Sequence, residues 1–399
     1  MIQGFYFRFY KLTHSERLSV FLSYLARFVY FLRFLFKRIF LKKENVEMGE
    51  DQALEILQRT SPDPALRPEY SRVPFDEEYD LSVIVPVYNH IDVLKRCLDS
   101  LVNQKTQYSY ELILVDDGST DGARKLVDQY ESIENVRVIH QENGGIAAAR
   151  NTGIHYARGR YLMFVDCDDY VHEDIVETLM TKAEKDAADI VMCAHALVKV
   201  KNGITISRLP NVYPLPINNM LGYMPEARIM NYDGLPWGKV YRRELFEGVR
   251  FFPGYWYEDT IIHSLIFTQC KEYTYIPEIK YEYQWYEKNF SHIQGGKKQL
   301  KAVDRYWLLK AILERYDELG LEKDEKFYTM LLKHVSAYYY PTVSSLSEDI
   351  IKAMFVVGRK LLLEYKPHRK IKLPYMLKLT ERAIINNNIA LWKLCSVNQ

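Results

Sequence analysis

The 399-residue sequence lacks several motifs that would identify a function directly. It contains neither G-x-G-x-x-G nor G-x-x-x-x-G-K-[ST], which argues against an NAD-dependent dehydrogenase and a P-loop ATPase. The first strand–helix turn, at residues 85–90, lacks the Gly-rich basic signature typical of sugar-nucleotide pyrophosphorylases. The net charge is only +1, so the overall charge gives no reason to expect nucleic acid as a partner.

Paired cysteines and long apolar runs are also missing. The five cysteines form no C-x-x-C pair, and their odd number favours a reducing compartment over a disulfide framework. Basic residues interrupt every 18-residue apolar stretch near the N-terminus, so we expect no membrane-spanning helix there. The same charges, and the lack of a small-residue cleavage site after them, argue against a secretory signal.

Residues 1–43 differ from the rest in composition, with nine Lys or Arg, one acidic residue and thirteen Phe or Tyr. On a helical wheel drawn for residues 24–41, the basic residues occupy one arc. The opposite arc carries Phe28, Leu32, Leu35, Phe36 and Ile39, while Phe34 and Leu41 fall outside it. This pattern predicts an amphipathic helix on the inner membrane surface, held by apolar burial and anionic lipid. The alternative is a helix docked on its own protein or on a partner subunit.

Regular alternation of strand and helix patterns begins near residue 81. Strands are expected at 81–87, 111–115, 136–140, 161–165 and 189–194, with helices at 91–103, 121–130, 146–157 and 173–185. This order predicts an α/β fold built from parallel βαβ units. Around it we expect a linker at 44–80 with a short helix at 52–59, a mixed, loop-rich region at 196–300, and a helical C-terminal region at 301–399.

The most informative cluster is acidic. Asp166, Asp168 and Asp169 follow a short apolar run, which predicts carboxylates at the end of a buried strand. Mg²⁺ typically takes one or two such carboxylates together with phosphate oxygens, and ligands of α/β sheets bind beyond the carboxyl ends of strands. The cluster therefore predicts a metal site that holds a phosphorylated ligand. The alternative is a solvated acidic turn that caps the next helix.

Two earlier strand ends also carry polar groups. At the first, Pro86 suits a strand terminus, Tyr88 could stack on a base, and Asn89 could cap the next helix. At the second, Asp116 or Asp117 could accept hydrogen bonds from a base or ribose.

A Gly-rich segment lies between the second strand end and the acidic cluster. Asn143, Gly144 and Gly145 open the helix expected at 146–157, where paired glycines let backbone N–H groups approach a ligand closely. Arg150, within that helix, could neutralise a phosphate or hold an acidic side chain.

Taken together, these motifs closely resemble those of the family 2 glycosyltransferases. The resemblance covers roughly residues 81–195 and rests on Val-Pro-Val-Tyr-Asn, Val-Asp-Asp-Gly-Ser-Thr-Asp, Glu-Asn-Gly-Gly…Ala-Arg-Asn-Thr-Gly-Ile and Val-Asp-Cys-Asp-Asp. It implies a GT-A fold, which is Rossmann-like with a mostly parallel central sheet flanked by helices. It also implies an inverting, metal-dependent transferase of the hexosyl class that uses a nucleotide-diphosphate sugar, usually a UDP-sugar, with Mn²⁺ or Mg²⁺.

The resemblance also implies roles for individual residues. Pro86, Tyr88 and Asp117 match positions that surround the uracil and ribose. Asp166 and Asp168 resemble the ends of the DxD motif, whose last acid meets the metal, and Asp169 faces the sugar or acceptor. The donor-binding set expected in the half at 81–195 is Pro86, Tyr88, Asn89, Asp116, Asp117, Asn143, Gly144, Gly145, Arg150, Asp166 and Asp169.

A second match lies in residues 196–300, expected to form the acceptor-side half. Trp237 and Lys239 begin a segment similar to the family's acceptor-side motif, and Glu258-Asp259 ends it. The resemblance makes Asp259 the catalytic base, with Lys239 and Glu258 nearby. The alternative is an ordinary helix start whose acids lie near the positive end of the helix dipole.

A third, looser match surrounds Gln284 and His292. Gln284 stands where relatives usually have Arg, which makes a phosphate-binding role there doubtful. His292 is either a third metal ligand or a surface histidine.

The expected function is transfer of a sugar to a hydroxyl of a glycan or lipid-linked acceptor in cell-surface polysaccharide synthesis, such as capsule formation. The chain would then lie peripherally on the cytoplasmic face of the membrane, and a homo-oligomer is left open. The alternative is a catalytically silent nucleotide-binding scaffold of a polysaccharide assembly complex.

Overall fold

The computed structural model describes residues 16–68, 78–201, 204–211, 234–285, 299–367 and 371–397. The chain forms two compact units, which we call the sheet unit and the helical unit. The sheet unit comprises Pro64–Lys297 and Lys310–Leu321, and the helical unit comprises Met1–Asp63, Lys298–Leu309 and Glu322–Gln399. This division differs from the expected boundaries, because described elements of the N-terminal part, such as the helix at Glu50–Thr60, pack with the C-terminal helices.

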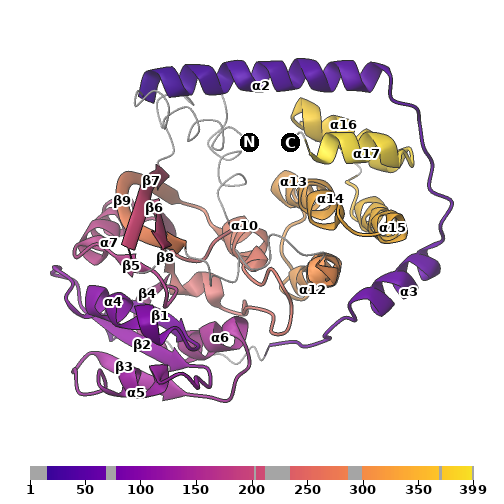
Figure 1. The fold of residues 1–399 in the computed structure, drawn as a ribbon. Coiled ribbons are helices and arrows are strands. Elements are labelled where there is room, and N and C mark those ends of the chain that lie inside the picture. Colours follow the sequence, from indigo (N-terminus) through magenta and orange to yellow (C-terminus); the bar gives the residue numbers. More distant parts are fainter. Residues whose placement is uncertain are drawn as a thin grey trace. The chain divides into compact units, whose positions relative to one another are not determined.

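The sheet unit contains one mixed sheet, whose described strands run in the order β3-β2-β1-β4-β8-β6-β9-β5, with β7 beside β6 (Figure 1). The first four of these are mutually parallel, as the alternating pattern predicts. β8 is antiparallel to both β4 and β6. The strands are β1 (Tyr79–Val87), β2 (Tyr110–Asp116), β3 (Val136–His140), β4 (Gly159–Phe164), β5 (Tyr170–Val171), β6 (Ile190–Lys201), β7 (Ile204–Asn211), β8 (Lys239–Arg242) and β9 (Tyr273–Trp285).

Helices cover both faces of the parallel part. Val83 and Val85 of β1 face a core that includes Leu94 and Leu98, while Ile84 faces the other way. On that second face α6 packs directly on β1 and β2. The segments of this unit are α4 (Ile91–Val102), α5 (Ala123–Asp128), α6 (Ile146–Tyr156), α7 (Ile175–Lys185), η1 (Arg243–Phe246), η2 (Ile262–Ile266) and α10 (Phe267–Gln269).

Residues 196–300 contribute more regular structure than the loop-rich pattern predicted. β9 runs from Tyr273 to Trp285 and pairs in parallel with most of β6. Its Tyr281 is fully buried, because the ring stacks on Trp237 inside the protein and is not exposed to solvent. The strand was hard to predict from the sequence because it is rich in tyrosine, which occurs at both buried and exposed positions.

The helical unit packs around Trp392, which is fully buried and donates its indole N–H to the Val335 carbonyl at 2.8 Å. α3 packs on α15 through the buried Ala53 and Leu57, so this part of the expected linker is an integral helix. The segments are α2 (Glu16–Ile39), α3 (Glu50–Thr60), η3 (Leu300–Val303), α13 (Glu325–Lys333), η4 (His334–Tyr338), α14 (Tyr339–Val343), α15 (Glu348–Glu364), α16 (Tyr375–Ile385) and α17 (Ile389–Ser396), and α12 (Asp304–Glu318) has residues in both units.

The N-terminal prediction of a helix is confirmed, although α2 begins earlier than the wheel analysis assumed. None of the helices in the described ranges combines the length and hydropathy required to cross a bilayer.

Candidate active site

The parallel register brings the predicted strand ends to one edge of the sheet. Val87 pairs with Asp116, Asp116 pairs with His140, and Ile84 pairs with Phe164, two residues before the acidic cluster begins at Asp166. Since parallel strands share one carboxyl edge, the motifs after β1, β2, β3 and β4 lie together there. The expectation that these motifs form one site is therefore supported by the strand pairing itself.

Asp117 is buried and fully engaged by the Gly-rich segment. Its carboxylate accepts the N–H groups of Gly144 and Gly145, each at 2.8 Å, and the amide of Gln141 at 2.7 Å. Gly145 has a φ of +84°, a left-handed value that a side chain would strain. The paired glycines thus direct their N–H groups to a carboxylate of the protein, and Asn143 is exposed at the start of this turn.

Asp116 is buried beside a histidine that the sequence analysis did not single out. His140 lies between two carboxylates, with Nδ1 2.9 Å from Asp116 and Nε2 2.9 Å from Asp128. Burial on its own would raise the pKa of Asp116, but hydrogen bonds from Ser119 and His140 outweigh it and lower the pKa. His140 could have been found from its position at the end of β3. Because β3 is parallel to β2, the two strand ends lie at the same edge of the sheet.

The first strand end is partly open. Tyr88 is 46% exposed, which leaves its ring accessible for stacking, while Pro86 is buried within β1. The expectation that Asn89 caps α4 is wrong, because its side chain accepts the N–H of Thr120 at 2.9 Å. Asp121 receives the first N–H of α4 instead, from Ile91 at 2.9 Å. The loops after β1 and β2 are thereby fixed to each other.

Arg150 joins the acidic cluster to the acceptor-side motif. Its guanidinium is 2% exposed and donates to Asp166 at 2.9 Å and to Glu258 at 2.8 Å. Burial on its own would lower the pKa of Arg150, but Asp166 and Glu258 outweigh it, with Asp259 adding to them, so the pKa is raised. Of the two roles expected for Arg150, the structure shows the second: it holds acidic side chains.

Asp169 is the most deeply buried of the three clustered acids. Its oxygens accept the Tyr281 hydroxyl at 2.7 Å and the Gln284 N–H at 2.8 Å. Burial raises the pKa of Asp169 well above its ordinary value, and the carboxylates of Asp168 and Asp166 add to this rise. Gln284 also donates its side-chain amide to the Asp168 carbonyl, so it supports the acidic turn from β9.

The remaining acceptor-side residues lie within the packing beneath the site. Trp237 stacks on Tyr281, with ring centroids 4.6 Å apart, and Lys239 donates to the carbonyls of Leu235 and Trp237 at 2.7 and 3.2 Å. Both are buried. Tyr281 links this packing to the acidic turn through its hydroxyl, a role that the sequence analysis did not assign to it.

The oxygen donors at this edge fit a hard divalent cation. Asp166 and Asp168 supply carboxylates, the ligands that Mg²⁺ combines with substrate phosphate. Across the ranges that the structure describes, no three His, Cys, Asp or Glu side chains gather into a metal cluster. These residues therefore fit a cation that is held by one or two protein carboxylates and by oxygens of a bound ligand. His292 lies outside the described residues.

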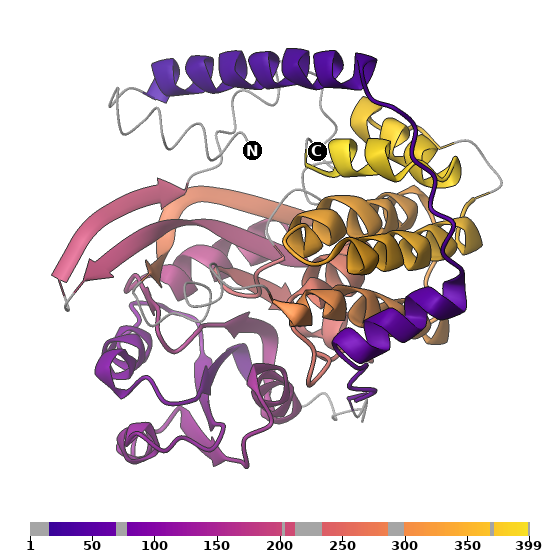
Figure 2. The same cartoon turned by 45° about the vertical axis from the view of Figure 1, so that its right-hand side comes forward.

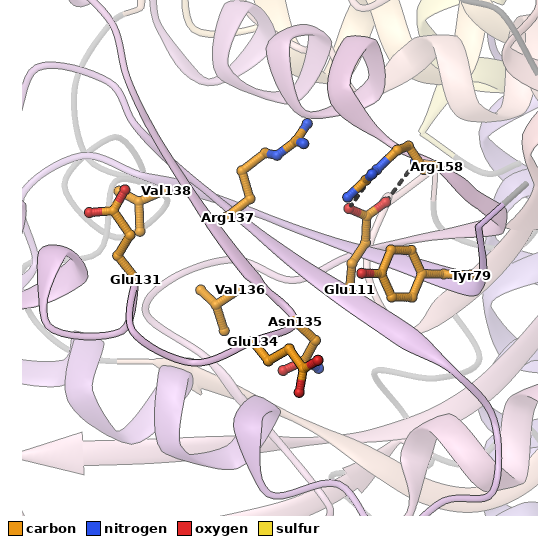
Figure 3. A pocket seen from close by; sticks show the side chains of 9 residues that line it. All are labelled: Tyr79, Glu111, Glu131, Glu134, Asn135, Val136, Arg137, Val138 and Arg158. Atoms are coloured by element: carbon orange, nitrogen blue, oxygen red, sulfur yellow. Dashed lines mark hydrogen bonds and ion pairs between the residues drawn. The ribbon is translucent and has the colours of Figure 1, made fainter. Parts of the chain in front are cut away.

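A polar pocket lies at the opposite edge, near the amino ends of β1, β2 and β3 (Figure 3). Glu111 and Arg158 meet there, and the Glu111 carboxylate accepts the Ser82 hydroxyl at 2.7 Å and the Arg158 N–H at 2.6 Å. These contacts connect neighbouring strands, and none of the predicted site residues lines this pocket. The candidate site is thus the acidic edge.

Comparison with known proteins identifies the class. Residues 82–250 match the family model described as glycosyl transferase family 2. The glycosyltransferase YibD of Escherichia coli, itself described as uncharacterized, is 31% identical over 252 residues, which cover 61% of this chain and 72% of YibD. The chain belongs to glycosyltransferase family 2.

Other relatives are longer or more distant. Glycosyltransferase GlyA of Streptococcus pneumoniae is 32% identical over 231 residues, which cover 56% of this chain but only 33% of GlyA. A fragment of Staphylococcus aureus TarS, solved with UDP-GlcNAc, superposes with a TM-score of 0.57 at 19% identity, covering 79% of this chain and 90% of that one. The likeness to TarS concerns the fold, and it confirms the predicted GT-A class with a helical C-terminal region.

Proposed function

We propose that this chain is an inverting glycosyltransferase that moves a hexosyl group from a nucleotide-diphosphate sugar, a UDP-sugar, to a hydroxyl group. The acceptor would be a glycan or a lipid-linked molecule in cell-surface polysaccharide synthesis. The observation that carries the proposal is the pair of ion pairs made by Arg150, because they connect Asp166 of the expected donor site with Glu258 of the expected acceptor site.

Asp259 is the proposed general base. It follows Glu258 directly, and its charge contributes to the raised pKa of Arg150, so it belongs to the same electrostatic group. A carboxylate at this place can accept the proton of the acceptor hydroxyl as the oxygen attacks the anomeric carbon. Arg150 and Glu258 would fix the position of this base relative to the donor, since geometry limits such a step.

Donor binding would use the carboxyl edge of the sheet. The exposed ring of Tyr88 would stack on the base, and Asp116 and Asp117 would fix the loops around it. Asp168, with Asp166, would hold Mn²⁺ or Mg²⁺. Such an ion, when bound, neutralises the charge that develops on the departing diphosphate.

Relatives guide the choice of substrates. A poly(ribitol-phosphate) beta-glucosyltransferase of Bacillus spizizenii is 40% identical over 116 residues, which cover 28% of this chain and 18% of that enzyme. Together with the UDP-GlcNAc bound to the TarS fragment, this favours a UDP-hexose and a polysaccharide or teichoic-type acceptor. We also propose peripheral association with the cytoplasmic face of the membrane through the N-terminal segment.

Donor hydrolysis provides the first test. Full-length protein is incubated with UDP-glucose, UDP-galactose or UDP-GlcNAc and Mn²⁺, and released UDP is measured. Asp259→Asn should bind UDP normally but lower turnover by about two to four orders of magnitude, the usual contribution of a general base. Asp349→Asn, at an exposed acid in the first turn of α15, is the matched control. Normal turnover by Asp259→Asn removes this residue from the role.

The same assay separates the enzyme from a silent scaffold. A scaffold would bind UDP and release none from any donor in the series. Asp168→Ala should weaken metal-dependent UDP binding, measured by calorimetric titration with and without Mn²⁺. Identical titrations of this variant and the parent protein would contradict the proposed metal ligand.

A further inference from the structure

Helix α2 has one face that packs on the protein and one that does not. Phe34 is 2% exposed and packs with Leu379 of α16 and Cys395 of α17. Arg38 donates to the Tyr375 hydroxyl at 2.8 Å, and the Phe31 ring meets the Tyr375 ring edge-on at 6.2 Å. Both views show the C-terminal end of α2 beside α16 and α17 (Figures 1 and 2). Phe34, which fell outside the predicted apolar stripe, is thus the buried residue of this contact, and the partly buried Leu35, which was assigned to that stripe, packs against the same cluster.

The undocked face carries a continuous apolar stripe. At about 100° per residue, eight large apolar side chains fall within roughly 100° of the wheel, and Phe34 lies about 120° or more from each of them. All eight are between 45% and 75% exposed. We call this set the apolar arc: Leu18, Phe21, Leu25, Phe28, Val29, Leu32, Phe36 and Ile39.

The positive charge of residues 17–43 indicates which partner the apolar arc binds. Residues 17–43 contain seven Lys or Arg and no Asp or Glu. Arg33 and Lys37 are exposed on the wheel beside one edge of the apolar arc. A second copy of this helix would bring like charges together, whereas anionic lipid headgroups would neutralise them. Aromatic and aliphatic side chains on one face, with basic residues beside them, are typical of helices that lie in a membrane interface.

We propose that the helical unit is a platform on which α16 and α17 hold α2, so that the apolar arc inserts into an anionic bilayer interface. This inference rests on the membrane association proposed above, and it adds the inserting face and a role for the C-terminal helices. Because the docked and inserting faces are different, α2 would bind lipid without leaving the protein.

Site-specific labelling tests the orientation. The five native cysteines are buried, so a cysteine introduced on the surface can be labelled selectively with an environment-sensitive dye such as NBD. Leu32→Cys reports on the apolar arc, and Tyr30→Cys, which is also exposed but about 160° away on the wheel, is the matched control. With vesicles of phosphatidylglycerol and phosphatidylcholine, the label at 32 should shift to the blue, and the label at 30 should not. Equal shifts at both positions would overturn the proposed orientation.

Two further variants test insertion and docking separately. Leu32→Asp should weaken vesicle binding at least about tenfold, because it places a charge where an apolar group would enter the bilayer interface. Phe34→Ala should lower the hydrogen-exchange protection of α2 in the lipid-free protein, while Leu32→Asp should leave that protection unchanged. Normal protection in Phe34→Ala, or unchanged vesicle binding by Leu32→Asp, would overturn the platform.

The controls distinguish this inference from the proposals beneath it. If the parent protein does not bind vesicles, both the platform and the membrane association fail, while UDP release still reports on the transferase. If the label at 32 shifts with protein concentration in the absence of lipid, the apolar arc binds a second copy instead, which also overturns the proposal.

Discussion

Replacing Arg150 with Met tests the link between the two halves of the candidate site. The substitution keeps an unbranched apolar stem but removes the guanidinium that contacts Asp166 and Glu258. Both carboxylates would then lack their cationic partner. Their side chains are 23% and 17% exposed, so water can reach them only in part.

The expected loss of unfolding free energy is large. Breaking a buried ion pair by removing one partner typically costs about 3–5 kcal/mol, and the partial exposure of the two acids places this case near the lower end. A domain's whole stability is about 5–15 kcal/mol, so the loss should be plain in urea denaturation. Lys95→Met, which breaks the exposed 2.6 Å pair with Asp99, is the control and should cost less than about 1 kcal/mol.

A double-mutant cycle that combines Arg150→Met with Glu258→Gln measures the interaction energy between Arg150 and Glu258. The combined loss should fall short of the sum of the single losses by at least about 1 kcal/mol, because both substitutions remove the same contact. In UDP release, Arg150→Met should also reduce turnover, since it frees the segment that carries Asp259. Strict additivity, or a stability loss no greater than that of Lys95→Met, would refute a connection through Arg150.

Two other predictions concern the same edge of the sheet and its packing. Asp116 has a lowered pKa, so its stabilising contribution is present above the ordinary Asp pKa of about 4 and is lost as pH falls through the folded-state value. The stability difference between the parent and Asp116→Asn should therefore shrink between pH 7 and pH 3 in urea titrations, and a constant difference would contradict this. Gly153→Ala should cost about 1–3 kcal/mol, because a Cβ there would lie 2.3 Å from Ile84. A second substitution, Ile84→Ala, should relieve part of that cost. Gly49→Ala is the control, because the space around Gly49 is open. A Gly153→Ala protein as stable as that control would contradict the steric overlap with Ile84.

Local patterns predicted the parallel half of the sheet closely. β3 spans the predicted 136–140, and α6 begins at Ile146 as expected, because alternating apolar residues and paired glycines act over a few neighbouring positions. That the Asn89 side chain bonds Thr120 rather than capping α4 could not be predicted, since Thr120 comes from another loop. The strand at Tyr273–Trp285 was missed because its many tyrosines give no clear alternation of buried and exposed positions, and its pairing with β6 is decided by the tertiary structure.

The sequence by itself determined the elements of the parallel half, the acids at its strand ends and the family, since each depends on residue types at short, fixed spacings. Only the tertiary structure decided which polar groups meet. Arg150 contacts the Glu258 carboxylate 108 residues away, and the Asp117 carboxylate accepts the N–H groups of Gly144 and Gly145. It also decided which face of α2 is docked, because Phe34 packs on helices more than 300 residues later in the chain. Such contacts depend on how separate segments fold together, and many pairings are compatible with the same local pattern.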